Sequence, residues 1–174
     1  MTKRGMSLKA RTARIDDAAA IAGIYNEGIA DRIGTFETTP RTPEQIASWF
    51  DGRHPIVVVE DDTGAVVAFA STSAYRDREC YAGLAEYSVY VARTRRGEGA
   101  GSAAMIALIE AATAAGFWKL VSRIFPENAP SLALMTRMGF REVGTYRRHG
   151  KLDGQWRDCV IVERLLGDAT CSYP

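Results

Sequence analysis

The residues with the clearest chemical potential form a basic, glycine-rich turn over residues 93–101, between an expected strand and an expected helix. This segment reads Arg-Thr-Arg-Arg-Gly-Glu-Gly-Ala-Gly. Glycine lets a backbone approach a ligand closely, and the free amides at a helix N-terminus attract anions. Arg95 and Arg96 add two full positive charges. The turn therefore predicts a cradle for a pyrophosphate group.

Two other phosphate-binding motifs compete for the same turn. A P-loop ends in Gly-Lys-Ser or Gly-Lys-Thr, and this turn does not. The dinucleotide-binding pattern G-x-G-x-x-A fits residues 99–104, and Glu127 lies near the place of a ribose-binding acid. However, the preceding strand, 85–91, has polar side chains on one face, whereas a buried parallel strand is apolar on both. A plain strand-to-helix turn without a ligand also remains open.

Charged side chains elsewhere in the sequence could act on a small anionic substrate. Glu86 lies on the same strand face as Ser88 and Tyr90. A buried carboxylate is costly unless it is paired or can take a proton, which favours a functional role for Glu86. Arg76 and Arg78 are two residues apart, so in an extended chain both guanidinium groups could clamp a doubly anionic ligand. Two solvated surface arginines are the alternative.

Composition excludes several broad classes of function. The 174 residues carry 22 Lys and Arg against 21 Asp and Glu, which leaves a formal net charge of +1. A nucleic-acid or membrane-surface binder needs a basic excess, so neither partner is expected. No apolar run approaches the ~18 residues of a membrane span, and no secretory signal is visible. The length fits one domain of roughly 100–200 residues, with residues 1–7 and 167–174 as loose ends.

The cysteines point to a reducing compartment and away from a metal site. Cys80, Cys159 and Cys171 are odd in number and widely spaced, which fits neither a disulfide framework nor a zinc knuckle. We therefore expect three reduced thiols, a cytoplasmic protein and no bound metal.

The elements that must position these residues follow from hydrophobic periodicity and capping signals. Asp16 offers an N-cap for a helix through Ile29, and Thr-Pro-Glu-Gln at 42–45 forms a capping box for a second helix to about residue 50. Two more helices are expected over 101–115 and 130–138. Strands are expected over 8–13, 56–60, 65–73, 85–91, 119–125, 140–146 and 157–165.

The order of these elements predicts the fold class. One strand and two helices precede three strands, and a helix, a strand, a helix and two strands follow. An antiparallel front half followed by a βαβα half implies a mixed, mostly antiparallel central sheet with helices on both faces. The expected class is therefore α/β, in the mixed α+β sense.

Two segments of the chain together resemble the GCN5-related N-acetyltransferase (GNAT) superfamily. Arg96, Gly99 and Gly101 match its coenzyme A pyrophosphate motif, Q/R-x-x-G-x-G/A. Asn128 and Ser131, followed by a Gly-Phe pair, match its N-x-x-S/A…G-F segment. Alone, the second segment indicates only the start of a helix. Together with the first segment it is specific for this superfamily. The resemblance implies the GNAT fold.

Within the superfamily the chain is similar to the phosphinothricin acetyltransferase group, which includes methionine sulfoximine and arsinothricin acetyltransferases. The similarity covers about residues 8–166. Its characteristic pieces are Gly-Thr-Phe-Glu at 34–37, Arg-Asp-Arg at 76–78, Ala-Glu-Tyr-Ser-Val-Tyr-Val at 85–91 and Gly-Lys-Leu-Asp-Gly-Gln-Trp-Arg-Asp at 150–158. The resemblance implies an amino-acid N-acetyltransferase that depends on acetyl-CoA.

The resemblance also implies roles for individual residues. Asn128 and Ser131 would contact the pantetheine arm. Glu86 would be the general base that takes a proton from the substrate's α-ammonium, directly or through water, while Tyr90 would shape the pocket. A backbone N–H near Val89 would hold the developing oxyanion. The full set expected to bind acetyl-CoA is Val89, Val91, Arg96, Gly97, Gly99, Gly101, Ser102, Asn128 and Ser131.

On the substrate side, the resemblance implies that Arg76 and Arg78 bind the acid groups of a glutamate-like amino acid. It also places Phe36 in the wall of the pocket. Residues 150–158 are expected to form a turn between the last two strands, where Lys151 would close the substrate side or meet a second subunit. Relatives are commonly dimers, so a homodimer is expected.

One departure from the family pattern concerns the general acid. Related enzymes often carry His in the helix after the Asn-x-x-Ser segment, whereas this chain has Met135 there. Met cannot donate a proton, so water or Tyr90 would protonate the coenzyme A thiolate that leaves when the acetyl group is transferred. His149, near Lys151, is a substitute candidate, and a surface imidazole is the alternative.

Two functions of different classes remain open on the sequence. The first is an N-acetyltransferase that acts on the α-amino group of a small glutamate-like amino acid, for resistance or detoxification. A different small amine is an alternative acceptor. The second is a non-catalytic acyl-CoA-binding sensor that keeps the same fold. Glu86, Tyr90 and the arginine pair favour the enzyme.

Overall fold

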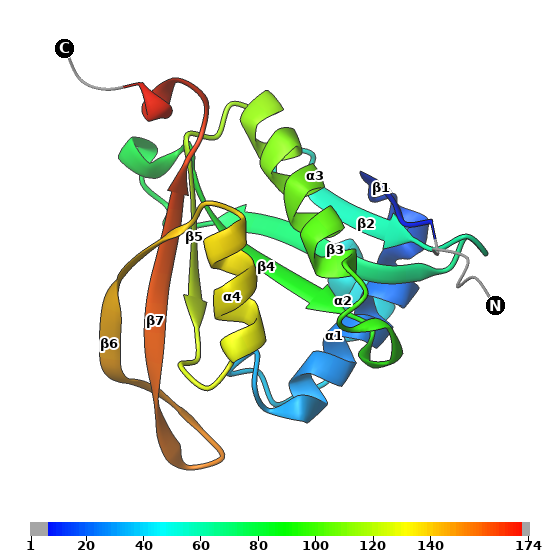
Figure 1. Cartoon of the computed structure of the whole chain (residues 1–174), viewed down its shortest axis with the longest axis horizontal. Coiled ribbons are helices and arrows are strands. Elements are labelled where there is room, and N and C mark those ends of the chain that lie inside the picture. The colour runs from blue at the N-terminus through cyan, green and yellow to red at the C-terminus, as the bar shows by residue number, and fades with distance from the viewer. Residues whose placement is uncertain (1–6, 172–174) are drawn as a thin grey trace.

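In the computed structural model, residues 7–171 are described, and they form a seven-stranded sheet with helices on both faces (Figure 1). The strand order is β1-β2-β3-β4-β5-β7-β6, and every neighbouring pair is antiparallel except β4 and β5, which are parallel. The strands are β1 Lys9–Thr12, β2 Ile56–Glu60, β3 Val66–Ala74, β4 Leu84–Val91, β5 Lys119–Ile124, β6 Arg141–Leu152 and β7 Gln155–Leu165. The α-helices are α1 Ala18–Asp31, α2 Pro43–Ala47, α3 Ala100–Ala114 and α4 Ala129–Arg137, and 3-10 helices lie at Ile15–Asp17, Glu79–Tyr81, Arg93–Arg95 and Gly167–Thr170.

The predicted fold class and order of elements are confirmed. Side chains alternate between the two faces of each strand, so the sheet carries two hydrophobic cores. α3 and α4 cover the face that carries Val57, Tyr87 and Leu120. α1 and α2 cover the other face, which carries Val58 and Phe69. The sheet therefore lies between two helical layers.

Strands β4 and β5 separate after a short paired stretch. Three residue pairs join them, and the last pair is Glu86 with Val121. Just beyond it the Ser122 hydroxyl donates to the Tyr87 carbonyl at 3.0 Å, and the two strands then diverge (Figure 1). Backbone groups of β4 along this gap need another partner, because unpaired buried amides are costly.

The last two strands are longer than predicted, and the turn between them is shorter. β6 runs to Leu152 and β7 starts at Gln155, so the expected turn over 150–158 is wrong. The chain reverses at Asp153 and Gly154, whose φ angles are 50° and 77°. A two-residue hairpin turn with positive φ at both central residues favours Asp-Gly, which is the dipeptide found here.

Local capping sets the helix starts. Asp17, rather than the predicted Asp16, organises the start of α1, and its carboxylate accepts the Arg14 amide at 2.7 Å. The capping box of α2 is confirmed. The Gln45 amide donates to the Thr42 hydroxyl at 3.3 Å, and the Thr42 amide donates to the Gln45 side chain at 2.9 Å.

The remaining differences lie at element ends. α2 stops at Ala47, earlier than residue 50, and the C-terminal stretch expected to be loose contains the 3-10 helix Gly167–Thr170. Residues 1–6 and 172–174, which belong to the two expected loose ends, lie outside the described residues.

Candidate active site

Two cavities meet where β4 and β5 separate. The first, of about 590 Å³, is bounded by this gap, the turn before α3 and the start of α4. The second, of about 450 Å³, lies between the loop after α1 and strands β4, β5 and β6. Both cavities are lined by Gly34, Tyr87, Ser88, Tyr90, Ser122, Arg123 and Phe125. A group bound in one cavity can therefore reach a group bound in the other through the gap.

The edge of β4 along the gap presents backbone amides. Ala92 donates its amide to the Val67 carbonyl of β3 at 2.8 Å. In an antiparallel pair alternate residues turn their backbone groups to the same neighbour, so Val89 and Val91 turn theirs toward the gap. The Val89 amide can thus donate to a bound carbonyl oxygen, while its role in holding an oxyanion stays a prediction.

The glycine-rich turn opens the N-terminus of α3 toward the first cavity. Gly97 and Gly99 have φ angles of 78° and 90°, and a Cβ at either position would meet no atom within 4 Å. Gly99 is the N-cap of α3, and no side chain of the described residues caps the helix. Gly101 and Ser102 line the same cavity, so the first helix amides and the positive end of the dipole face a space suited to an anion. A Cβ at Gly101 would lie 3.2 Å from Leu134, so glycine here lets α3 and α4 pack closely.

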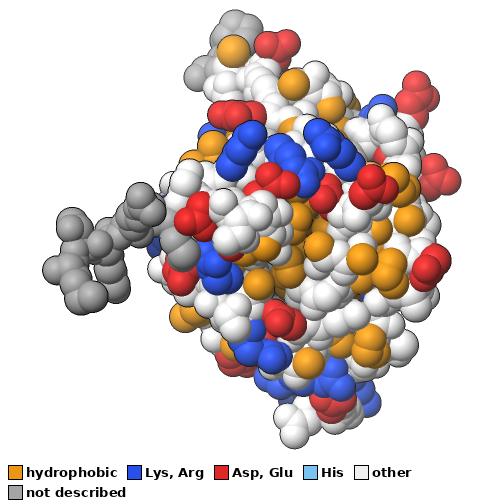
Figure 2. All heavy atoms as spheres, turned by 90° about the vertical axis from the view of Figure 1, so that its right-hand side faces the viewer, with side chains coloured by type: hydrophobic (Ala, Val, Ile, Leu, Met, Phe, Trp, Pro, Cys, Tyr) orange, Lys and Arg blue, Asp and Glu red, His pale blue; other side chains and the backbone are white. Residues whose placement is uncertain are grey.

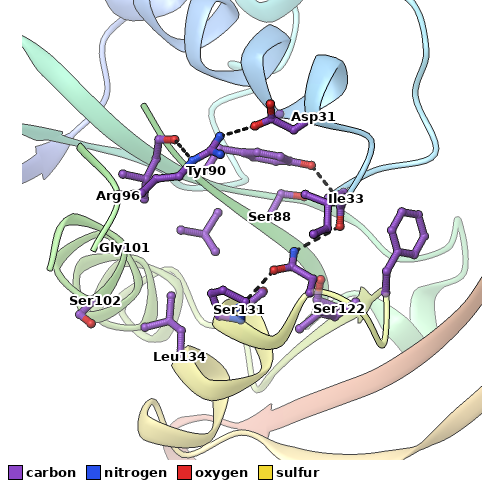
Figure 3. A pocket seen from close by; sticks show the side chains of 18 of the residues that line it. Asp31, Ile33, Ser88, Tyr90, Arg96, Gly101, Ser102, Ser122, Ser131 and Leu134 are labelled. Atoms are coloured by element: carbon purple, nitrogen blue, oxygen red, sulfur yellow. Dashed lines mark hydrogen bonds and ion pairs between the residues drawn. The ribbon is translucent and has the colours of Figure 1, made fainter. Parts of the chain in front are cut away.

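Arg96 is the arginine of the turn that faces the first cavity. Its guanidinium lies 2.7 Å from Asp31 Oδ2 at the end of α1 (Figure 3). The Arg93 guanidinium lies 2.7 Å from Asp31 Oδ1. Burial raises the pKa of the Asp31 carboxyl, but the two guanidinium groups outweigh it and hold that pKa below its ordinary value. Arg96 is still 43% exposed. It is thus oriented by a charged carboxylate and remains accessible to an anion.

Arg95 does not line this cavity, and its contribution of charge beside a pyrophosphate stays a prediction. Its guanidinium lies 2.8 Å from Asp61, in the turn between β2 and β3, and 2.8 Å from Glu98. Neither carboxylate lines the first cavity. Figure 2 shows the same arrangement over a whole face, where Lys and Arg side chains lie among Asp and Glu side chains.

The start of α4 forms the opposite wall of the first cavity. Asn128 is its N-cap, and the side-chain oxygen accepts the Ser131 amide at 3.3 Å. The side-chain nitrogen donates to the Ile33 carbonyl at 3.3 Å, which ties α4 to the loop after α1 (Figure 3). Asn128 and Ser131 both line the cavity, and their contact with pantetheine stays a prediction.

Glu86 lines the second cavity and is paired with an arginine that sequence reasoning missed. Arg123 Nη2 lies 2.5 Å from Glu86 Oε1. The Glu86 side chain is 29% exposed, so this carboxylate is half-buried rather than buried as predicted. A ligand in the cavity has access to it, and the arginine compensates its charge. The general-base role of Glu86 stays a prediction.

Tyr90 stands at the junction of the two cavities. Its hydroxyl donates to the Gly34 carbonyl at 3.2 Å, and its ring packs against Phe69 and Tyr25. A Cβ at Gly28 would lie 2.6 Å from this ring, so the close approach of α1 requires glycine. Burial raises the pKa of the Tyr90 hydroxyl, which weakens it as an acid. The arrangement therefore suits a wall residue better than a proton donor.

Phe36 lies in the wall of the second cavity, as the family resemblance implied. Its ring packs edge-on against Phe125 with centroids 4.9 Å apart, and a Cβ at Gly150 would lie 2.7 Å from it. Lys151 lines neither cavity of the described chain, because its ammonium lies 4.5 Å from the centre of a Trp156 ring. Its role on the substrate side stays a prediction.

The prediction that Arg76 and Arg78 project together from an extended chain is wrong. The Arg78 amide donates to the Arg76 carbonyl at 2.9 Å, so the chain bends between them. The Arg76 guanidinium lies 5.3 Å from the Tyr75 ring centre, and that of Arg78 lies 6.0 Å from the Tyr81 ring centre. Neither arginine lines the two cavities within the described chain, and their contact with substrate stays a prediction.

The position at which the family pattern often has His faces the core. Met135 is 1% exposed, and its sulfur accepts the Tyr87 hydroxyl at 2.6 Å. A proton donor at this position would therefore not reach either cavity without a rearrangement of the core. His149 does line the second cavity, with its ring 4.8 Å from that of Tyr146.

Arg123 and Cys159 line the second cavity, although neither was predicted as a site residue. The position of Arg123 beside Glu86 follows from the register in which β4 and β5 pair. Glu86 and Val121 are parallel neighbours, so Arg123, two residues on, shares their face. Periodicity identifies a strand and its faces but not which strand lies beside it.

Neither a metal site nor a membrane-spanning helix occurs within residues 7–171. In this range no group of three or more His, Cys, Asp or Glu side chains is arranged to hold a metal ion. None of the helices there combines the length and apolar character needed to cross a bilayer.

Comparisons with known proteins agree with this geometry. Residues 21–140 match the model of the Acetyltransferase (GNAT) family. The L-methionine sulfoximine/L-methionine sulfone acetyltransferase of Pseudomonas aeruginosa is 35% identical over 97% of this chain and 100% of its own length. The phosphinothricin N-acetyltransferase of Streptomyces coelicolor is 33% identical over 87% of this chain and 92% of its own. The crystal structure of a GNAT superfamily phosphinothricin acetyltransferase from Sinorhizobium meliloti in complex with AcCoA has a TM-score of 0.87 and 33% identity, covering 96% of this chain and 92% of that one.

Proposed function

The chain belongs to the GNAT acetyltransferase family, and from that premise we propose that it moves the acetyl group of acetyl-CoA to the α-amino group of a small glutamate-like amino acid. Phosphinothricin and methionine sulfoximine are named for its relatives, and arsinothricin is a third candidate of similar shape. One observation carries the proposal: the two cavities meet at the gap between β4 and β5, with anion-binding amides in the first and Glu86 in the second.

The donor groups of the first cavity fit coenzyme A. The free amides at the start of α3, together with Arg96, suit a pyrophosphate. The edge of β4 at Val89 and Val91 suits the amide groups of a pantetheine arm, which can pair with it as an added strand would. When bound, acetyl-CoA supplies an acetyl group activated as a thioester.

The side chains at the gap suit transfer to an amine. An α-ammonium is mostly protonated near pH 7, so Glu86 takes a proton from it, directly or through water. The free amine then attacks the thioester carbonyl carbon, and the Val89 amide donates to the carbonyl oxygen as negative charge grows there. The carbon–sulfur bond breaks, and coenzyme A leaves as a thiolate that takes a proton from water. Tyr90, held by the Gly34 carbonyl, forms the wall between the two cavities.

We also propose that the protein is a cytoplasmic homodimer whose reaction serves resistance or detoxification. All three cysteines are free, which supports a reducing compartment. Tyr146 and Trp156 on the β6–β7 hairpin are 53% and 55% exposed, which supports a subunit contact there. Light scattering on the purified protein tests the dimer, and a monomeric mass would contradict it.

A substrate panel tests the proposed reaction. Thiol release from acetyl-CoA is measured with phosphinothricin, methionine sulfoximine, arsinothricin, glutamate and a polyamine, and kcat/KM is compared. We expect the highest values for one or more of the three glutamate-like compounds and the lowest for the polyamine, because Arg123 disfavours a cationic acceptor. Stabilisation by acetyl-CoA without turnover of any amino acid would contradict the proposal and favour a non-catalytic sensor.

A further inference from the structure

Arg123 is, among the described residues, the one lysine or arginine that lines the second cavity. Its side chain is 44% exposed, and it lines the first cavity as well, so it lies at the junction where the acceptor amine must sit. We propose that Arg123 binds the α-carboxylate of the acceptor and so restricts the enzyme to α-amino acids. This inference rests on the proposed function of the same site.

Strand register explains why Arg123 and Glu86 meet. β4 and β5 pair in parallel as far as Glu86 and Val121, and Arg123 is the next residue on that face of β5. The strands separate at this point, so the arginine has no cross-strand neighbour on β4 and turns to the carboxylate, 2.5 Å away. No other ion pair of Arg123 is found in residues 7–171.

The surrounding charges leave this pair as the charged contact open to a ligand. Glu37 is the other carboxylate that lines the second cavity, and Arg41 holds it at 2.8 Å. Arg76 and Arg78 line neither cavity within the described chain. Of the ion pairs found in residues 7–171, Glu86 with Arg123 is therefore the one whose two side chains both line the second cavity, since Arg41 does not line it.

An α-amino acid carries the complementary charges, an ammonium and a carboxylate group attached to the same carbon. Its ammonium can take the place of Arg123 beside Glu86, and its carboxylate can take the place of Glu86 beside Arg123. Each protein charge then keeps one partner of opposite sign. Guanidinium also bonds a carboxylate in two-pronged fashion. An amine without the carboxylate would pair with Glu86 but leave Arg123 without an anionic partner, and an unpaired group of this kind discriminates against the amine.

The test compares methionine sulfoximine with its α-carboxamide, in which the carboxylate is neutral and the amine is kept. Both are assayed with the wild type, Arg123→Gln and Arg123→Lys. We expect Arg123→Gln to lower kcat/KM for the acid on the order of 100-fold. The kcat/KM for the carboxamide should change much less. Arg123→Lys should recover part of the loss, because it restores the charge but not the two-pronged geometry.

Arg141→Gln is a matched control, because Arg141 also lies 2.5 Å from a glutamate, Glu163, but lines neither cavity. We expect its kcat/KM for the acid to equal that of the wild type. If Arg123→Gln lowers kcat/KM equally for the acid and for the amide, Arg123 only positions Glu86 and the proposal is overturned. An Arg123→Gln enzyme with unchanged kcat/KM for both compounds would also overturn it. Failure of the wild type to acetylate methionine sulfoximine, phosphinothricin or any other amino acid would instead contradict the proposed function.

Discussion

At the scale of single residues, the proposed reaction needs a group that takes a proton from the substrate's α-ammonium, because only the neutral amine can attack an acyl carbon, and we propose Glu86 for this role. We expect Glu86→Gln to lower kcat by at least about 100-fold, because general-base catalysis is typically worth 10²–10⁴-fold. The KM for acetyl-CoA should stay nearly unchanged, since Glu86 lines the second cavity and not the first. Steady-state kinetics with thiol detection measures both constants.

The control for this prediction is Glu142→Gln. Glu142 is exposed on β6 and lines neither cavity, so the change removes a carboxylate of the same size from the surface. Its kcat should match that of the wild type. A Glu86→Gln enzyme with wild-type kcat would mean that another group, or water alone, takes the proton.

Alternation along the strand placed Glu86 and Tyr90 on one face, and the family resemblance implied Phe36 in the pocket wall. All three side chains line the second cavity. These two signals could not predict Arg123, because its meeting with Glu86 depends on the parallel pairing of β4 with β5. The same reasoning failed for Arg76, whose orientation depends on a bend after β3 that spacing does not reveal. What the sequence leaves open at this scale is therefore long-range register and loop geometry.

At the scale of elements, the turn before α3 should tolerate no side chain at its glycines without a cost in cofactor binding. Gly97 and Gly52 have φ angles of 78° and 77°, and a Cβ at either meets no atom within 4 Å. Alanine at either position should therefore lower the free energy of unfolding by a similar 1–3 kcal/mol, roughly. Only Gly97→Ala should also raise the KM for acetyl-CoA, because Gly97 lines the first cavity and Gly52 does not.

Urea denaturation and steady-state kinetics on the two variants measure these effects separately. Equal KM values for acetyl-CoA in Gly97→Ala and Gly52→Ala would show that the turn does not approach the ligand closely. Comparison of the two variants thus distinguishes the effect of backbone strain on stability from the effect of ligand contact on acetyl-CoA binding.

Element order, the capping box of α2 and the glycine stop after α4 were all readable from the sequence, because each depends on a few neighbouring residues. The β6–β7 hairpin was misjudged although its signal was present. The Asp-Gly dipeptide at 153–154 marks a two-residue turn, and the polar residues around it belong to two exposed strand ends. Exposed edge strands lack the apolar alternation on which strand prediction depends.

At the scale of the whole molecule, one ion-pair cluster ties three elements together and should make the fold sensitive to acid. Arg11 of β1 lies 2.8 Å from Asp17, before α1, and 2.6 Å from Glu60 of β2. The hydrogen bond from Arg11 holds the pKa of Asp17 below its ordinary value of 3.8. A carboxyl with a lowered folded-state pKa stabilises the fold above its unfolded-state pKa and loses this contribution as the pH falls.

We therefore expect Asp17→Asn to be less stable than the wild type at pH 7, with a difference that shrinks as the pH falls below about 3.8. Urea midpoints at a series of pH values from 7 to 3 measure the difference. A difference that stays constant over this range would show that Asp17 contributes through packing or amide bonding rather than through its charge.

The two cavities are also a property of the whole molecule, because β4 and β5 separate between two helical layers. In the proposed reaction, donor and acceptor would approach from different cavities and meet at a gap lined by both strands. Near-neutral net charge suits this arrangement, since the site needs a few placed charges and not a charged surface.

The most direct test of the account is to identify the product formed from acetyl-CoA and methionine sulfoximine or phosphinothricin. Mass spectrometry and thiol titration on one reaction mixture give the amounts of acetylated amino acid and of free coenzyme A. We expect one α-N-acetyl amino acid for each thiol released, at a rate that Glu86→Gln reduces by at least about 100-fold. Thiol release without N-acetylated product, or binding of acetyl-CoA with no turnover of any amino acid, would contradict it.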